Sequence, residues 1–299
     1  MKNYPRDMVG YGKKLPRVVW PDKARLALQF VLNYEEGAES SVLHGDKSSE
    51  IFLSEIINAQ PIKGRHINME SIYEFGSRSG FWRIHEMFQE KKIPITIFGV
   101  GMALERNQEV CNAIKESNYE VASHGWRWID YQNISKAKEK KDMQLAIKSI
   151  SKIFGQRPLG WYTGRCSPNT RDLVMEEGGF LYDSDSYSDD LPYWEIRGKK
   201  KQLIIPYTLD NNDMRFATNQ GFNSGDQFYT YLKDSFDALY SEGNTKPKMM
   251  SVGLHCRLIG RPGRIQSLRK FLDYVLKHDD VWICKRVDIA KHWIKNHSI

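Results

Sequence analysis

The sequence of 299 residues lacks several features that assign chains to specialised classes of protein. Its four cysteines form no CxxC pair, which argues against a disulfide framework and against a thiolate zinc site. The N-terminal residues contain no apolar core of an export signal, and no stretch approaches the roughly 18 apolar residues of a membrane-spanning helix. We therefore expect a cytoplasmic protein that has no membrane partner.

Internal repeats, low-complexity segments and linkers rich in proline, glycine or serine are also absent from the sequence. This absence favours a single catalytic domain over residues 1–299, in which residues 1–24 form an N-terminal extension. The formal net charge is +7, but Lys and Arg are scattered, and the longest basic run is Lys199–Lys201. Scattered positive charge is typical of a solvated surface, so we expect no nucleic-acid partner.

Apolar segments alternate regularly with amphipathic segments along the chain. Hydrophobic residues make up 40% of the sequence and charged residues 27%, as in ordinary soluble enzymes. Strands are expected at residues 25–33, 94–100, 119–124, 158–163, 180–185, 202–208, 249–255 and 281–284, and helices at 80–92, 102–117, 135–154, 168–177, 226–241, 263–277 and after 284. The alternation predicts an α/β fold whose parallel sheet has helical crossovers, closed as a barrel or open as a doubly wound sheet.

Charged and polar residues stand at the carboxyl ends of the expected strands. They are Asn33, Glu35, Glu36, His124, Arg165, Asp183, Asp185 and His255. In a parallel barrel these ends converge on one face, where active sites are built. We therefore predict that these side chains meet in an active site.

Glu35 and Glu36 are neighbours in the segment NYEEG (33–37). Side chains of adjacent residues in an extended chain point to opposite faces, so only one of the two carboxylates needs to enter a site. Gly37 would allow the chain to bend there and bring in both. The alternative interpretation is a pair of surface glutamates in a turn.

His124 and His255 each end an expected strand, and their equivalent positions favour a functional pair over two structural histidines. Arg165 either forms an ion pair with an acid such as Asp183 or orients a carboxylate that does chemistry. Four residues after His124, where a second imidazole could share a zinc ion, the sequence has Trp128. This departure leaves open a damaged metal site, no metal site at all, or a site rebuilt to work without a metal.

The order of these residues resembles the motifs of the polysaccharide deacetylase (NodB-like) superfamily, whose fold is a distorted (β/α) barrel of about seven parallel strands. In that family an Asp–Asp pair follows the first strand. Here Glu35 stands at the position of the family's base and Glu36 at that of a metal ligand. The family's histidine pair is matched by His124 but not by Trp128, and its Leu–His pair is matched by Leu254–His255.

Longer strings of sequence narrow this resemblance to one branch of the superfamily. SHGWRWIDYQ, GWYTGRCSPNTR, IPYTLDNNDMRF and GLHCRLIGRPGR are very similar to the metal-independent allantoinases of bacterial purine breakdown. Arg165 and Pro168 also resemble the superfamily's arginine motif, with one extra residue between them. The resemblance implies a hydrolase of non-peptide carbon–nitrogen bonds that opens the hydantoin ring of allantoin to allantoate. It further implies a homotetramer that needs neither a metal nor another cofactor.

Without a metal, hydrolysis would depend on organic groups alone. Glu35 or Glu36 would take the proton from the attacking water, and the sequence leaves open which of them does so. His255 would protonate the departing ring nitrogen or hold the developing oxyanion, with His124 as a further donor.

Four further residues are expected to contact the substrate. Trp128 and Arg165 would line the pocket, whereas Asn212 and Arg215, in the polar segment 208–216 that follows an expected strand, would hold the ureido or hydantoin groups. The alternative interpretation of this segment is a packing or oligomer contact.

Two rival functions remain open from the sequence. A metal-dependent N-deacetylase of chitin or peptidoglycan would need the second histidine that Trp128 replaces. A catalytically inactive carbohydrate-binding relative would have lost its acid–base residues, yet both glutamates and both histidines are present.

Overall fold

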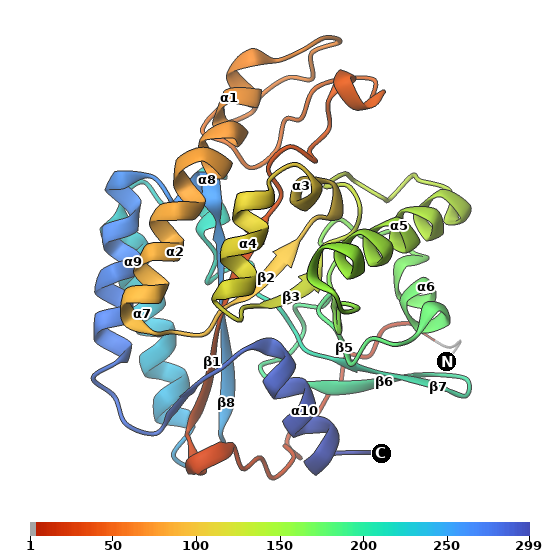
Figure 1. Ribbon diagram of the computed structural model, residues 1–299. Coiled ribbons are helices and arrows are strands. Elements are labelled where there is room, and N and C mark those ends of the chain that lie inside the picture. Colours follow the sequence, from red (N-terminus) through yellow and green to blue (C-terminus); the bar gives the residue numbers. More distant parts are fainter. Residues whose placement is uncertain (1–3) are drawn as a thin grey trace.

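The strands of the molecule form one curled sheet, and the computed structural model describes residues 4–299 of the chain (Figure 1). The strands are β1 (Leu26–Tyr34), β2 (Thr96–Gly99), β3 (Glu120–Ser123), β4 (Gly160–Trp161), β5 (Tyr182–Asp183), β6 (Tyr193–Arg197), β7 (Lys200–Ile204), β8 (Lys248–His255) and β9 (Val281–Ile283). Their order in the sheet is β6-β7-β5-β4-β3-β2-β1-β8, and β9 also pairs with β1. The first three residues of the expected N-terminal extension lie outside the described residues.

The predicted α/β fold with a parallel sheet is confirmed. Neighbouring strands run parallel, except that β6 and β7 form an antiparallel pair. The sheet curls into a half-barrel that ends at β6 and at β8. An isolated parallel bridge between Asn212 and Gly253 attaches the loop after β7 to β8.

Helices connect the strands and surround the sheet (Figure 1). They are α1 (Ile67–Phe75), α2 (Phe81–Lys91), α3 (Gly101–Glu105), α4 (Gln108–Glu116), α5 (Lys136–Phe154), α6 (Thr170–Glu177), α7 (Gly225–Glu242), α8 (Cys256–Ile259), α9 (Pro262–Val275) and α10 (Arg286–Asn296). Shorter turns are η1 (Pro21–Lys23), η2 (Val42–His44), the π-helical η3 (Gly76–Gly80) and η4 (Asp213–Ala217). Within residues 4–299, no helix combines the length and the apolar character needed to cross a bilayer.

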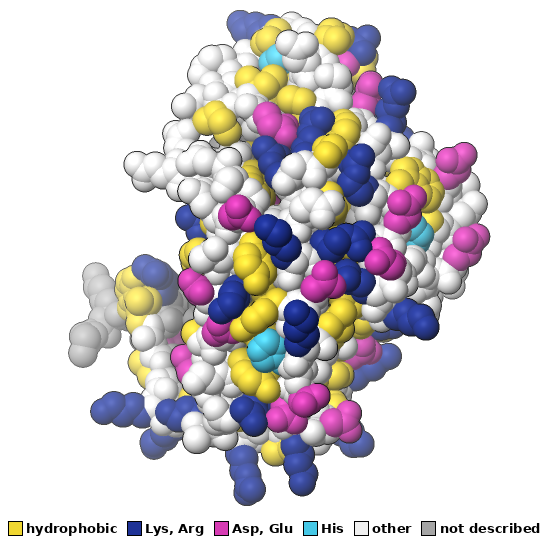
Figure 2. All heavy atoms as spheres, turned by 90° about the vertical axis from the view of Figure 1, so that its left-hand side faces the viewer, with side chains coloured by type: hydrophobic (Ala, Val, Ile, Leu, Met, Phe, Trp, Pro, Cys, Tyr) yellow, Lys and Arg dark blue, Asp and Glu magenta, His cyan; other side chains and the backbone are white. Residues whose placement is uncertain are grey.

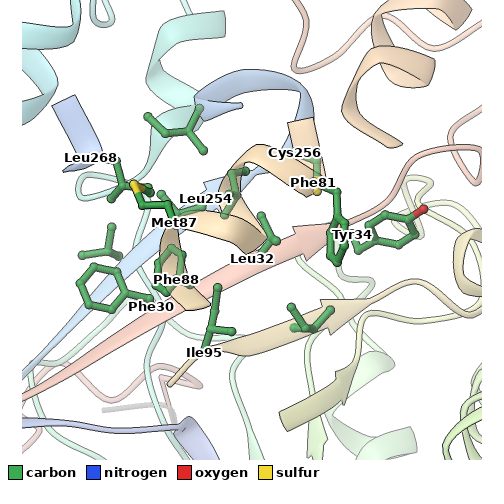
Figure 3. Close-up of a cluster of buried hydrophobic side chains, with 14 of the residues drawn as sticks. Phe30, Leu32, Tyr34, Phe81, Met87, Phe88, Ile95, Leu254, Cys256 and Leu268 are labelled. Atoms are coloured by element: carbon green, nitrogen blue, oxygen red, sulfur yellow. The ribbon is translucent and has the colours of Figure 1, made fainter. Parts of the chain in front are cut away.

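The first strand is buried along its whole length, and its alternating side chains enter two different parts of the core. Figure 3 shows Phe30, Leu32 and Tyr34 on the side that packs against Met87 and Phe88 of α2. The rings of Phe30 and Phe88 meet edge to face, 5.5 Å apart. Removing one such side chain from water contributes roughly 1.5–3 kcal/mol, so this packing holds β1 firmly in the centre of the sheet.

Strand pairing brings three carboxyl ends to one place. Asn33 of β1 is in register with Phe98 of β2 on one side and with His255 of β8 on the other. His124 directly follows β3, and its backbone N–H donates to the carbonyl of Gly99 at the end of β2. The residues that follow β1, β3 and β8 are therefore neighbours in space.

The surface formed by α2, α7 and α9 carries both signs of charge (Figure 2). Lys91 lies in an ion pair with Asp273, and Arg269 pairs with Glu90 at 2.9 Å. On this face the basic side chains are interspersed with acidic ones. The two signs of charge are therefore mixed on this face.

Several local features differ from the sequence-based expectation, and among them are helices α1 and α8, which were not expected. The helix expected over 102–117 is two helices, α3 and α4, because the side chain of Asn107 accepts a hydrogen bond from the Val110 N–H and begins a new helix there. Strand β6 was not expected either. Its segment YWEIR is partly exposed and lies at the edge of the sheet, so it has no continuous apolar run of the kind that marks a buried strand.

Candidate active site

Glu35 follows β1 directly and lies between two imidazoles. Its Oε1 atom is 3.3 Å from Nε2 of His124 and 3.5 Å from Nε2 of His255. The exposed fractions of Glu35, His124 and His255 are 1%, 2% and 4%, so this group of charges is shielded from solvent. Three of the residues that the sequence predicted at strand ends are thus brought together.

Arg257, in the short helix α8, binds both neighbouring glutamates. Its Nη1 atom donates to Oε2 of Glu35 at 2.8 Å and to Oε1 of Glu36 at 3.4 Å. Its Nε atom donates to the carbonyl of Leu53 at 2.8 Å. Sequence reasoning did not select Arg257, although its position two residues after His255 at a strand end was a usable signal.

The backbone turns as soon as β1 ends, and this turn explains why both carboxylates reach one guanidinium. The Ala38 N–H donates to the carbonyl of Glu35 at 3.0 Å, and Gly37 has a φ of 92° that favours glycine. Glu36 folds back so that its Oε2 accepts from the Glu35 N–H at 3.0 Å. A Cβ atom at Gly76 would stand 2.3 Å from Oε1 of Glu36, so glycine leaves the room that this carboxylate needs.

Asp213 fixes the orientation of His255. Its Oδ1 atom is 2.6 Å from Nδ1 of the imidazole, and its Oδ2 accepts from the backbone N–H groups of His255 and Ile259 at 2.8 and 3.0 Å. Because Nδ1 donates its proton to this carboxylate, Nε2 is directed at Glu35, and it carries a proton when the ring is an imidazolium. Asp213 was missed in the sequence, where it stands 42 residues before its partner.

The electrostatics of the cluster separate the two glutamates. Burial alone would raise the pKa of Glu35, but Arg257 and His255 hold this pKa well below its ordinary value. Burial raises the pKa of Glu36, and the neighbouring Glu35 adds to this effect although Arg257 opposes it. Burial would lower the pKa of His255, yet Glu35 and Asp213 raise it to about 9. At neutral pH, Glu35 is therefore a carboxylate and His255 an imidazolium.

The His124 ring is positioned by aromatic neighbours. It lies edge to face with Phe98 at 6.1 Å and tilts against Tyr162 at 4.8 Å. Its buried Nδ1 atom has no hydrogen-bond partner among the described residues, whereas Nε2 faces Glu35. The ring is thus held by packing, with one nitrogen directed into the charged cluster.

Trp128 forms the wall next to this cluster. Its ring stacks on Phe52 with centroids 6.1 Å apart and tilts against Tyr73. The guanidinium groups of Arg165 and Arg257 lie over it, at 4.9 and 5.1 Å from the ring centroid. Both guanidinium groups are therefore at a distance at which the π face of the indole attracts a cation.

Arg165 has a different partner from the one that the sequence suggested. Its Nη1 atom donates to Glu50 at 3.1 Å, whereas Asp183 pairs with Arg171 at 3.2 Å. The alternative that Arg165 orients a carboxylate that does chemistry is not seen at Glu35 and Glu36, because Arg257 is the arginine that binds them. Arg165 reaches the site through its stacking on Trp128.

The loop after β7 contributes Asp213 to the cluster. The residues predicted from the sequence in this loop were Asn212 and Arg215. Asn212 caps η4, with its Oδ1 accepting from the Met214 N–H at 2.9 Å. Arg215 lies over the ring of Phe222 at 4.5 Å. Both side chains therefore make local contacts, and Asp213 between them is the residue that reaches His255.

The zinc ion used by metal-dependent deacetylases does not fit the side chains at this place. Trp128 offers no donor where the second histidine would stand, and the carboxylates of Glu35 and Glu36 already bind Arg257. Within residues 4–299, no group of three or more His, Cys, Asp or Glu side chains has the arrangement of a metal site. The side chains at this place are therefore not the set of ligands that a zinc ion needs.

A cavity lies in another part of the described chain. It has a volume of about 580 Å³ and is lined by Tyr11, Tyr187, Asp210 and Ser251, among others. None of Glu35, His124 and His255 lines it. It is therefore not the space in which these three residues act.

Comparison with known proteins gives consistent results along the whole chain. A family model described as polysaccharide deacetylase matches residues 69–176. A candidate polysaccharide deacetylase of Schizosaccharomyces pombe is 41% identical over 98% of both chains. Among solved structures, a candidate polysaccharide deacetylase of Pseudomonas aeruginosa PAO1 is 58% identical, with a TM-score of 0.97 over 99% of this chain and 100% of the other. PuuE allantoinase is 57% identical, with a TM-score of 0.97 over 99% of both chains.

Proposed function

Because the chain belongs to the polysaccharide deacetylase family, we propose that it is a hydrolase of that family which opens the hydantoin ring of allantoin to allantoate without a metal. The observation that carries this proposal is the buried carboxylate of Glu35 between the Nε2 atoms of His124 and His255. The identity of 57% to PuuE allantoinase along the whole chain supports the substrate.

In the proposed reaction Glu35 is the general base. It takes a proton from water as the water oxygen bonds to a ring carbonyl carbon, and a tetrahedral intermediate forms. His255, protonated at neutral pH, then donates to the ring nitrogen as the carbon–nitrogen bond breaks. Glu35 Oε1 lies 3.5 Å from His255 Nε2, so the proton taken from water returns to the imidazole and the site is reset.

The other residues of the site support this step. The Nε2 atom of His124 faces the same carboxylate, which supports a role for His124 as a donor to the oxyanion. Asp213 keeps His255 in the required orientation. Trp128 and Arg165 line one side of the site. An imide-like ring nitrogen is a better leaving group than the nitrogen of an ordinary amide, so hydrolysis by organic groups is feasible.

We assign Glu35 rather than Glu36 as the base. Glu35 contacts both imidazoles, whereas Glu36 accepts from the Glu35 backbone and from Arg257. Asn212 and Arg215 are proposed as substrate contacts because they lie in the same loop as Asp213.

A cytoplasmic homotetramer acting in purine breakdown is the setting that the resemblance to allantoinases supports.

Removal of metal ions should leave the proposed activity essentially unchanged. Trp128 cannot ligate zinc, and the two glutamates are bound by Arg257, so a chelator has no functional ion to remove. Protein dialysed against a strong chelator would be assayed for allantoin opening and, in parallel, for acetate release from N-acetylglucosamine oligomers. Complete loss of activity that zinc restores would contradict the proposal, and acetate release alone would favour the deacetylase alternative.

Asp213→Asn should move the basic limb of the pH profile to lower pH. The charge of Asp213 helps to raise the pKa of His255 to about 9, and the acid is active only while protonated, so wild-type activity falls as pH rises through this value. Loss of a neighbouring opposite charge shifts a pKa by roughly 1–3 units. The measurement is kcat/KM from pH 6 to pH 10.

Asp210→Asn is the matched control for this prediction, because Asp210 lies in the same loop but binds Thr208 at 2.8 Å. Its profile should equal that of the wild type. An unmoved basic limb in folded Asp213→Asn would show that His255 is not the acid.

A further inference from the structure

We infer that Arg257 is the fixed cation of this site, which takes the place that a metal ion has in metal-dependent relatives and offers its remaining nitrogen to an oxygen of the substrate. The identity of the substrate rests on the proposed function, whereas the role of Arg257 as the cation rests on its contacts in the structure. Arg257 is fully buried and donates from Nη1 to both Glu35 and Glu36.

The first argument is charge. Two adjacent carboxylates in a buried site are costly unless a cation neutralises them. His255 contacts Glu35, but Arg257 is the cation that contacts both. A guanidinium cannot lose its proton in a protein, so its charge is as permanent as that of a metal ion.

The second argument is the way in which the guanidinium is held. Nε donates to the Leu53 carbonyl, and the group lies over Tyr73 at 4.2 Å and over Trp128 at 5.1 Å. Trp128 is the residue that replaces the metal-binding histidine of the family pattern. An indole attracts a cation but cannot ligate zinc. A tryptophan at this position therefore suits a site whose cation is Arg257 and not a zinc ion.

The third argument is a donor without an acceptor. The Nη2 atom of Arg257 is buried and has no hydrogen-bond partner among the described residues, although the other two nitrogens are bonded. A buried charged donor that is left free next to the proposed base is suited to a ligand oxygen. The chemistry fits the carbonyl oxygen of a cyclic amide, whose negative charge grows as water attacks the carbon.

Zinc binding tests the cation without any assay of activity. Trp128→His should bind no stoichiometric zinc, because Arg257 still holds the carboxylates. The same change combined with Arg257→Ala should bind a single zinc ion per chain, since a histidine pair and a free carboxylate are then present. Both would be measured by titration calorimetry on protein whose folding has been checked by circular dichroism. Stoichiometric zinc in the single variant would overturn the inference.

Kinetics test the role in the reaction. Arg257→Gln should lower kcat for allantoin by about 10²–10³-fold, the usual cost of removing one oxyanion donor, and Arg257→Lys should lose less because it keeps the charge. Guanidinium chloride below denaturing concentration should restore part of the activity of Arg257→Ala. Arg261→Ala, a change of an arginine that pairs with Glu55, is the control and should show neither effect.

The outcomes separate the two proposals. Wild-type kcat in folded Arg257→Gln would overturn the role of Arg257. If the wild-type protein did not open allantoin at all, the proposed function would fail, and the zinc titration would still decide whether Arg257 is the resident cation.

Discussion

Glu35→Gln should lower kcat for the opening of allantoin by about two to four powers of ten, the usual size of a general-base effect. Glutamine keeps the shape of the side chain but cannot take a proton from water. The position is decisive because Oε1 of Glu35 is within 3.5 Å of both imidazole Nε2 atoms. Steady-state kinetics at pH 7, with the melting temperature as a check on folding, would measure the loss.

Glu36→Gln is the matched variant, one residue further along the chain and bound to the same arginine. It should lose less activity, because Glu36 supports the turn after β1 and contacts neither imidazole in the described structure. An equal or larger loss in Glu36→Gln would transfer the role of base to that residue. Full activity in both variants would rule out a glutamate base and leave His124 or His255.

His255→Gln should also lower kcat by about two to four powers of ten, because the general acid for the ring nitrogen is lost. It should in addition remove the basic limb near pH 9, since that limb reports the imidazolium that Glu35 and Asp213 stabilise. The pH dependence of kcat/KM distinguishes this effect from simple structural damage.

His85→Gln is the control for this second prediction. His85 lies in α2, where its ring stacks on Phe81 outside the charged cluster, and its replacement should leave the pH profile unchanged. A basic limb that survives in His255→Gln would mean that another group supplies the proton.

The residues predicted at strand ends were found because a parallel sheet makes position along the chain informative. Each strand end is marked in the sequence by the change from apolar to polar residues, and parallel pairing then brings these ends together. In this way Glu35, His124 and His255 could be selected without knowledge of any distance. Their catalytic roles remain predictions.

Arg257 and Asp213 could not be selected in the same way. Arg257 lies in a helix of four residues and Asp213 in a short 3-10 turn, where no periodic pattern fixes the direction of a side chain. Their partners are 222 and 42 residues away along the chain. From the sequence, Arg165 was one candidate to orient a catalytic carboxylate, but its side chain binds Glu50.

The central position of β1 also determines when the protein can fold. This strand forms near the start of synthesis, yet its long neighbour β8 is made more than two hundred residues later, since Glu35 and Arg257 are 222 residues apart. Until then the backbone N–H and C=O groups on one edge of β1 lack the partner strand β8, and such edges promote association between unfinished chains. A fold with so many distant contacts is expected to form slowly. The catalytic cluster would be among the last parts to assemble, so a nascent chain would have no activity before it is almost complete.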